Sequence, residues 1–372
     1  MELAGRDLGV LDADSHFQEP VNWLADTDEA LARRCPGTAL LVGMANFVGV
    51  DPRQPPDTPF WNALARWATS STLADTRALA NDEATAGFFS AEPFDAATRI
   101  EWLDRNGIDH QVCNPTVATQ MHLGTSVVAP SLAAAVARAF NEWAAAVTHD
   151  WSRLHATALV DLSDEGDESH HLKRFADSGS LTYLLPIDEG VWSSLGTEPL
   201  ARLSNDALEL GLVAVMHLGV ALPAATRPGG SVPRWADNQL RAQRCLLGWV
   251  VSQRDHGRPC GSVLVQELGI DWAVPWLRNL RRSEATPVLS MLAPSRSTSL
   301  YSTARSQVAW IPLPRDPIEE VVASSDAPRL IFGSDFPHSE GWGLDPLAAA
   351  RSRGWDPFPE GQASPGDSSR EP

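Results

Sequence analysis

The chain has 372 residues, a hydrophobic fraction of 43% and a formal charge of -18 at pH 7. The length and the ordinary apolar fraction predict one large globular domain or two small ones, with enough apolar residues for a sizeable core. The negative charge argues against nucleic acid or an anionic membrane as a partner, although a local basic pocket for an acidic substrate remains compatible with it.

The location of the protein is predicted from three features of the sequence. The first residues contain no basic stretch followed by an apolar run, so we expect no signal peptide. No uninterrupted apolar segment is long enough to span a bilayer. The four cysteines are far apart and without Cys-x-x-Cys spacing: Cys35, Cys113, Cys245 and Cys260. Free thiols are typical of a reducing compartment, so we expect a cytoplasmic protein.

The first predicted strand covers residues 8–13 and leads to Asp14 and His16. A long region rich in Pro, Phe and Trp follows at about residues 21–94, without clear helical or strand periodicity. Such an insertion in a compact domain is usually functional or disordered. Its aromatic content favours a packed lid after the first strand, and an outer layer of helices is the alternative.

From residue 97 onwards, helical and strand patterns alternate. The predicted helices cover residues 97–106, 131–148, 165–175, 199–210, 237–254, 273–282 and 317–324. The later predicted strands cover residues 109–114, 155–161, 181–187, 212–217, 262–267, 287–292 and 330–332. This alternation predicts a parallel sheet with right-handed crossovers. Eight strands favour a (β/α)8 TIM barrel of the α/β class, since no Gly-x-Gly-x-x-Gly supports an open doubly wound sheet.

We therefore predict a single barrel domain over residues 1–346. Residues 347–372 are rich in Pro, Gly and Ser. This composition predicts a disordered C-terminal tail.

Polar side chains stand at the same end of several predicted strands, and in a barrel these ends form one rim. They are Asp14 and His16 at the first strand, His217 at the fifth, Glu267 at the sixth, and Asp335 and His338 at the eighth. Three carboxylates and three imidazoles at one rim would repel one another or be desolvated at high cost without a cation. The pattern therefore predicts a site for one or two divalent metals.

Each of these residues also has an ordinary structural explanation. The explanations are a helix N-cap for Asp14 or Asp335, a core position for His217, an arginine partner for Glu267 and an exposed loop for His338. The joint pattern is more specific than any one member. Asp12 and Asp161 also lie at strand ends, and we expect structural hydrogen bonds for them.

Three segments together resemble one known family. The segments LDADSHFQEP (11–20), RIEWLDRNGID (99–109) and FGSDFPHSEG (332–341) resemble the amidohydrolase-related TIM-barrel metalloenzymes, which include aminocarboxymuconate-semialdehyde decarboxylase. The resemblance covers about residues 8–346. In that family the first strand supplies a His-x-His metal pair, the fifth a metal-binding His, the sixth a catalytic His, and the eighth an Asp that binds metal or acts as a base.

The chain departs from the family pattern at three positions. Asp14 replaces the first histidine, Glu267 replaces the sixth-strand histidine, and His338 is an added ligand candidate. This variant pattern resembles a side branch of non-heme di-iron oxygenases of natural-product biosynthesis. The resemblance implies two iron ions on the six candidate ligands, catalytic roles for Asp335 and Glu267, an electron donor, and a bulky apolar substrate, with acyl-CoA as one candidate.

Three hypotheses for the function follow. The first is a di-iron monooxygenase of secondary metabolism that hydroxylates a bulky apolar substrate. The alternative is a zinc- or manganese-dependent hydrolase or decarboxylase, in which His16, His217 and a carboxylate hold the metal and Asp335 acts as the base. The third is a barrel that has lost catalysis and only binds ligands. The sequence leaves the substrate and the formation of a homo-oligomer open.

Overall fold

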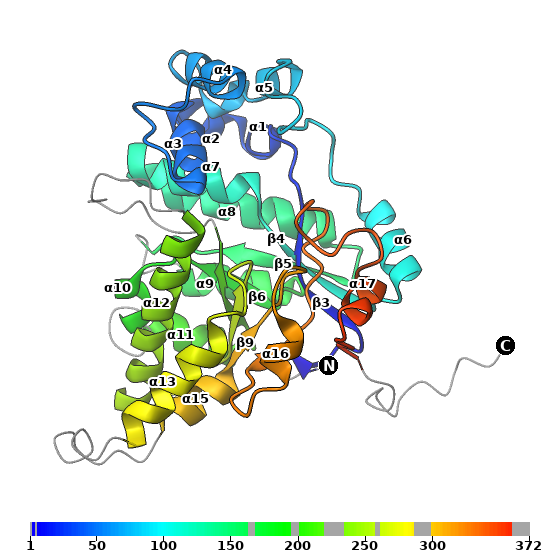
Figure 1. The fold of residues 1–372 in the computed structure, drawn as a ribbon. Coiled ribbons are helices and arrows are strands. Elements are labelled where there is room, and N and C mark those ends of the chain that lie inside the picture. Colours follow the sequence, from blue (N-terminus) through cyan, green and yellow to red (C-terminus); the bar gives the residue numbers. More distant parts are fainter. Residues whose placement is uncertain are drawn as a thin grey trace.

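The computed structural model describes residues 2–3, 6–162, 168–194, 201–218, 234–256, 261–285 and 299–358. Its centre is a sheet of eight parallel strands in the order β10-β9-β8-β7-β6-β5-β4-β3 (Figure 1). The strands are β3 (Leu11–His16), β4 (His110–Asn114), β5 (Leu154–Leu159), β6 (Thr182–Leu185), β7 (Val213–His217), β8 (Val263–Gln266), β9 (Val308–Trp310) and β10 (Arg329–Leu330). A separate two-stranded pair, β1 (Glu2–Leu3) and β2 (Arg6–Asp7), precedes them.

Backbone hydrogen bonds join the two ends of this sheet. The chain continues past β10 alongside β3, where Ala13 N donates to Phe332 O at 2.9 Å and Asp335 N donates to Asp14 O at 2.7 Å. Gly333 permits this close approach, since a Cβ at Gly333 would lie 2.5 Å from the Cβ of Asp14. The predicted α/β barrel is therefore confirmed.

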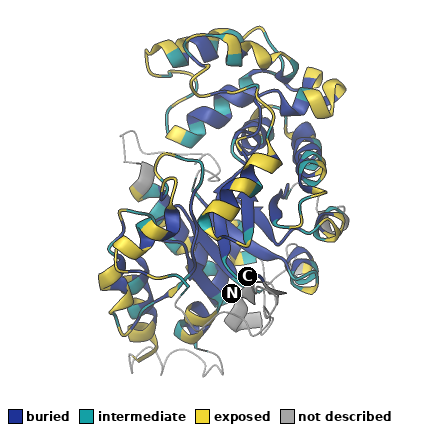
Figure 2. Cartoon of the chain, turned by 90° about the vertical axis from the view of Figure 1, so that its right-hand side faces the viewer, coloured by how far each residue is buried: buried dark blue, intermediate teal, exposed yellow. Residues whose placement is uncertain are grey.

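Helices surround the sheet, with buried inner faces and exposed outer faces (Figure 2). They are α6 (Ala96–Asn106), α7 (Val117–Val128), α8 (Pro130–Thr148), α9 (Glu168–Asp177), α10 (Glu189–Ser194), α11 (Ala201–Glu209), α12 (Arg234–His256), α13 (Ala273–Ala285), α15 (Leu300–Gln307), α16 (Ile318–Val322) and α17 (Pro346–Ser352). Local sequence explains their ends. For example, the Asp95 side chain caps α6, and Gly107 ends it with a φ of +65°, which glycine adopts at little cost.

The predicted helices and strands agree with most of these elements, with three corrections. β3 extends to His16, so Asp14 and His16 lie inside the first strand rather than after it. The predicted strand at 287–292 lies outside the described residues, and the strand between β8 and β10 is the unpredicted β9. Helices α7, α10 and α15 were also not predicted. β9 has only three residues and directly follows α15, so it is too short to show an alternating pattern.

The region predicted to lack periodicity is largely helical. It contains α1 (Trp23–Thr27), α2 (Glu29–Arg34), α3 (Thr38–Val48), α4 (Pro59–Ala68), η1 (Leu73–Asp75) and α5 (Arg77–Asn81), at the top of Figure 1. α3 packs on α7 through two glycines. A Cβ at Gly43 would lie 1.9 Å from Gln120 O, and one at Gly124 would lie 1.7 Å from Ala39 O. The insertion is thus packed directly against the barrel's own helices.

The described structure continues past residue 346, where the tail was predicted to begin. Asp345 caps α17 by accepting a hydrogen bond from Ala348 N, and Pro346 starts the helix. Beyond α17, the Trp355 ring lies 6.2 Å from that of Phe332. The chain is therefore ordered and packed through residue 358, and the remaining tail lies outside the described residues. None of the helices that the structure describes is long and apolar enough to cross a membrane.

Candidate metal centre

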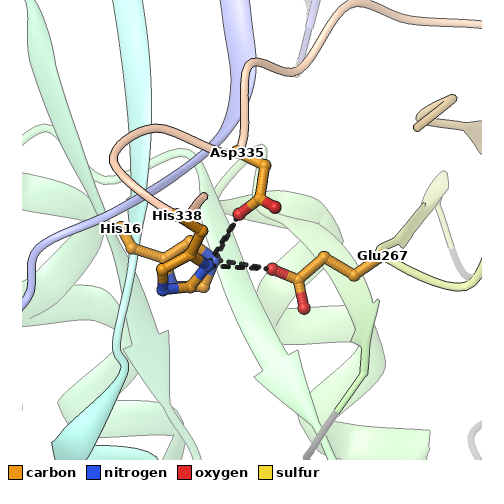
Figure 3. Close-up of side chains that lie close together, drawn as sticks. All are labelled: His16, Glu267, Asp335 and His338. Carbon is orange, nitrogen blue, oxygen red and sulfur yellow. Dashed lines mark hydrogen bonds and ion pairs between the residues drawn. The ribbon is translucent and has the colours of Figure 1, made fainter. Parts of the chain in front are cut away.

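The six predicted ligands come together at the C-terminal rim of the barrel. β3 carries Asp14 and His16, β7 ends at His217, Glu267 follows β8, and Asp335 and His338 follow β10. Their ligand atoms form two overlapping groups in which all atoms lie within 4.8 Å of one another: His16, Glu267, Asp335 and His338, and Asp14, His16 and His217. Figure 3 shows the first group.

His16 lies at the centre of the site. Its Nε2 atom is 3.2 Å from Glu267 Oε1, 3.2 Å from His217 Nε2 and 3.6 Å from Asp335 Oδ1. Asp14 Oδ1 is 3.9 Å from the Nε2 atoms of both His16 and His217. The potential metal-binding atoms of these five residues therefore lie close together around His16 Nε2.

His338 contacts the two carboxylates that follow β8 and β10. Its Nδ1 atom is 2.8 Å from Asp335 Oδ1 and 3.3 Å from Glu267 Oε1 (Figure 3). Glu267 and Asp335 have φ angles of +53° and +54°, in the left-handed region that residues other than glycine seldom adopt. Such conformations cost about 1–3 kcal/mol each and cluster at functional sites.

The helix-cap alternative for Asp14 and Asp335 and the arginine partner for Glu267 do not hold. Asp14 lies inside β3 and therefore caps no helix. Asp335 accepts a hydrogen bond from the backbone of His338 in a turn, and the next described helix, α17, is capped by Asp345. The ion pairs of Glu267 in the described part of the chain are with histidines rather than an arginine.

Burial and mutual repulsion raise the pKa values of two carboxyls. Asp14 is buried and close to Glu267 and Asp335, so its pKa lies well above the ordinary value. Burial and the negative charge of Glu267 raise the pKa of Asp335 to about 8. Burial also opposes the charge of Glu267, but His217 and His16 outweigh it and hold the pKa of Glu267 well below its usual range.

The two imidazoles that face these carboxyls shift in opposite directions. Burial, together with the nearby His338, lowers the pKa of His16 to about 3, so this ring is neutral and able to bind a metal. Burial also opposes a charge on His338, but hydrogen bonds to Asp335 and Glu267 outweigh it and raise the pKa of His338 to about 11. A protonated His338 thus balances part of the negative charge of the site.

The site fits a divalent metal. The Oδ2 atoms of Asp14 and Asp335 are buried and have no hydrogen-bond partner among the described residues. A buried acceptor without a partner costs about 1–3 kcal/mol, and more when it is charged. A cation would satisfy both oxygens, and a mixture of imidazole and carboxylate donors suits zinc, manganese or iron.

The two groups of donors share His16, and we assign His16 to the residues on strands, which leaves two sets of three. An imidazole nitrogen has one lone pair, so His16 Nε2 can bind only one metal. Asp14, His16 and His217 lie on strands, and we call them the strand subsite. Glu267, Asp335 and His338 follow strand ends, and we call them the loop subsite.

Several residues that support the site were not predicted from the sequence. Thr116 Oγ1 lies 3.1 Å from His16 Nδ1, and the Thr116 backbone N–H donates to the buried carboxylate of Glu19. Arg99 donates to His16 O at 2.7 Å. Their partners lie roughly a hundred residues away along the chain, so no local pattern could reveal these pairs.

The structural roles expected of two other acids are confirmed. Asp12 accepts hydrogen bonds from Ser334 and from the Gln111 side chain at 2.7 Å. Asp161 Oδ2 lies 2.8 Å from His122 Nε2. Cys35, Cys113 and Cys245 are free and buried, and Cys260 lies outside the described residues.

A cavity of about 900 Å³ opens over the metal residues. His16, His217, Glu267 and His338 lie on its wall. The insertion after β3 contributes further wall residues, which are largely apolar: Met44, Phe47 and residues 86–90. A cavity of this size is typical of sites for small molecules. The insertion therefore shapes the cavity, and its role as a movable lid stays a prediction.

Comparison with solved structures identifies the fold. An amidohydrolase from Mycobacterium avium subsp. paratuberculosis K-10 superposes with a TM-score of 0.58, at 17% identity over 94% of both chains. A 2,6-dihydroxybenzoate decarboxylase gives 0.54 at 14% identity over 95% of both chains. The protein has the amidohydrolase barrel fold. A 5-carboxyvanillate decarboxylase from Novosphingobium aromaticivorans, in complex with manganese, gives 0.55 at 12% identity over 91% of this chain and 89% of the other.

These comparisons confirm the resemblance to the amidohydrolase-related decarboxylases at the level of the fold. No protein-family model matches the sequence, and no curated protein matches it either. The solved structures described above are an amidohydrolase and two decarboxylases, and none of them is an oxygenase. The comparisons therefore give no support to the predicted di-iron branch.

Proposed function

We propose that this protein is a divalent-metal-dependent enzyme that hydrolyses or decarboxylates an apolar substrate with an acyl or carboxyl group. The observation that carries this proposal is that Asp14 and Asp335 each have a buried oxygen without a hydrogen-bond partner among the described residues, beside three imidazoles that line a large cavity. The decarboxylases with the same fold support it, and one of them binds manganese.

The strand subsite of Asp14, His16 and His217 would hold the metal. Its two imidazoles and one carboxylate are the donor types of catalytic zinc and manganese sites. A cation bound there polarises a carbonyl or carboxyl group and lowers the pKa of a bound water. His16 suits this role because its low pKa keeps the ring neutral.

The loop subsite would carry out the proton transfers. With a pKa of about 8, Asp335 can hold a proton at neutral pH and exchange it with a substrate atom. Its Oδ1 atom faces His338, while its Oδ2 atom has no partner among the described residues. Asp335 is thus oriented by one oxygen, while its other oxygen is buried and free of a partner among the described residues.

Glu267 and His338 would support these steps. Glu267 Oε1 lies 3.3 Å from Nδ1 of His338 and so orients that ring. The protonated His338 ring lies on the cavity wall, where it can stabilise negative charge that develops on the substrate. Glu267 therefore replaces the sixth-strand histidine of the family as an orienting group rather than as an acid.

The test is turnover without oxygen. Protein loaded with Mn²⁺ or Zn²⁺ is incubated anaerobically with a panel of hydroxybenzoates and aryl esters, and CO2 and free acid are measured. We expect turnover of at least one substrate, which a chelator abolishes and added metal restores. The variant His217→Ala is the matched inactive control. Failure to take up either metal, or turnover that depends on dioxygen, would overturn the proposal.

A second candidate is the di-iron monooxygenase, with an iron ion in each subsite. The observation that favours it is Glu267, which gives the loop subsite three donors of its own. This reaction would also need an electron donor, and an acyl-CoA is a candidate substrate. Two iron equivalents per chain, together with substrate-dependent oxygen uptake, would favour it over hydrolysis or decarboxylation.

A further inference from the structure

Asn114, the last residue of β4, lies beneath the strand subsite and is 1% exposed. Its Nδ2 atom donates to Asp14 Oδ1 at 2.8 Å and to Gln266 Oε1 at 3.1 Å. The amide of Gln266 in turn donates to Ala13 O at 2.7 Å, next to Asp14 in the chain. Asn114 thus connects the carboxylate of Asp14 with β8, a strand that is not its neighbour in the sheet.

A neighbouring hydroxyl sets the orientation of the Asn114 amide. Thr157 Oγ1 donates to Asn114 Oδ1 at 2.7 Å, and it also lies 2.8 Å from Thr182 Oγ1. If the amide were turned over, its oxygen would face the acceptor oxygens of Asp14 and Gln266. That arrangement would lose both hydrogen bonds and place acceptors against acceptors. The nitrogen therefore faces Asp14.

This contact leaves room on the carboxylate for a metal. Asp14 Oδ1 accepts one hydrogen bond and has a second lone pair, and it is the oxygen that lies 3.9 Å from both imidazole Nε2 atoms. The Oδ2 atom has no partner among the described residues. A carboxylate ligand held by a hydrogen bond from outside the metal shell is a common arrangement, and the outer partner contributes to metal affinity.

We propose that Asn114 is a positioning residue of the metal centre, which acts through Asp14 and is itself oriented by Thr157. This inference rests on the proposed function, because it assumes a metal in the strand subsite. Asn114 would then belong to a chain of hydrogen bonds inside the barrel, which runs from Thr182 through Thr157 and Asn114 to Asp14.

The test is Mn²⁺ binding to the full chain, measured as free Mn²⁺ by electron paramagnetic resonance, with the spectrum of the bound ion recorded separately. The variant Asn114→Leu keeps the approximate volume and removes the donor. We expect it to weaken Mn²⁺ binding by about 10–100-fold and to change the bound-ion spectrum. Thr157→Val should shift both readouts in the same direction by less. The matched control is Thr125→Val, because the buried Thr125 hydroxyl donates to Met121 O within α7 and is not part of this chain.

The outcomes separate the two proposals. If the wild type binds no Mn²⁺, this inference fails, and if it binds no Zn²⁺ either, the proposed function fails as well. If the wild type binds Mn²⁺ and Asn114→Leu binds it equally well with an unchanged spectrum, only the role of Asn114 is overturned. If Asn114→Leu does not fold, Thr157→Val decides: weaker binding supports the role, and unchanged binding overturns it.

Discussion

The two subsites of the candidate metal centre use the same residue types but are built differently. Asp14, His16 and His217 lie on regular strands, and all three are buried. In the loop subsite, Glu267 and Asp335 adopt left-handed backbone conformations after their strands end, and the His338 side chain is 18% exposed. Rigid strands suit a metal that needs fixed donors, and adaptable loop residues suit proton transfer to a substrate.

The largest expected effect comes from Asp335→Asn, which removes the proposed acid–base group and keeps the shape of the side chain. We expect activity to fall by about 10²–10⁴-fold, as is typical for loss of a general acid or base. Mn²⁺ bound in the strand subsite should remain. Steady-state kinetics and metal analysis of the same sample check this prediction. Loss of all bound metal would instead make Asp335 an essential ligand and remove the distinction between the subsites.

The second-largest expected effect is a difference in Mn²⁺ affinity between variants of one histidine from each subsite. We expect His217→Ala to lower Mn²⁺ affinity by more than about 100-fold, above the range for partners outside the metal shell. His338→Ala should leave the tight Mn²⁺ site in place, since His338 is not a donor of the strand subsite. Titration of both variants with Mn²⁺ measures this contrast. The reverse order of effects would assign the metal to the loop subsite.

Metal affinity should also depend on pH in a defined direction. Burial and the charges of Glu267 and Asp335 raise the pKa of Asp14 well above its usual value, so a metal must displace a proton from it. Because raising the pH removes that proton, affinity should rise with pH, by about tenfold per pH unit for each displaced proton below the pKa. Mn²⁺ titrations from mildly acidic to neutral pH test this. An affinity that is independent of pH would contradict the raised pKa of Asp14.

The smallest effect concerns Glu267→Gln. Hydrogen bonds to Asp335 and Glu267 raise the pKa of His338 to about 11, so loss of the Glu267 charge should lower this pKa. We therefore expect His338 to titrate at a lower pH in this variant than in the wild type. NMR of both proteins, each loaded with diamagnetic Zn²⁺, measures this difference. Zinc stoichiometry should not change. A loss of zinc in this variant would show that Glu267 is a metal ligand, as the sequence first indicated.

The sequence alone was sufficient to predict that the six candidate ligands lie at one rim of the barrel. Asp14, His217, Glu267 and Asp335 could be found because each stands at the C-terminal end of an apolar strand, and barrel topology makes those ends meet. Asn114 and Thr116 could not, since asparagine and threonine are common near strand ends, and only folding brings them to Asp14 and His16.

The fold was predictable to a similar extent. The long helices and most strands have clear periodicity, whereas β9 has three residues and shows none. The insertion looked irregular because its helices are short, and their stability comes from packing such as the contact of Gly43 with α7. Both errors therefore concern elements that are too short to show a clear sequence pattern.

The central claim is that the strand subsite binds a divalent metal. A crystal structure of the protein soaked in Mn²⁺, with anomalous diffraction data collected to locate manganese, tests it most directly. We predict an anomalous peak within bonding distance of Asp14, His16 Nε2 and His217 Nε2. The absence of a peak at these three residues, or a peak only beside Asp335 and His338, would contradict the claim.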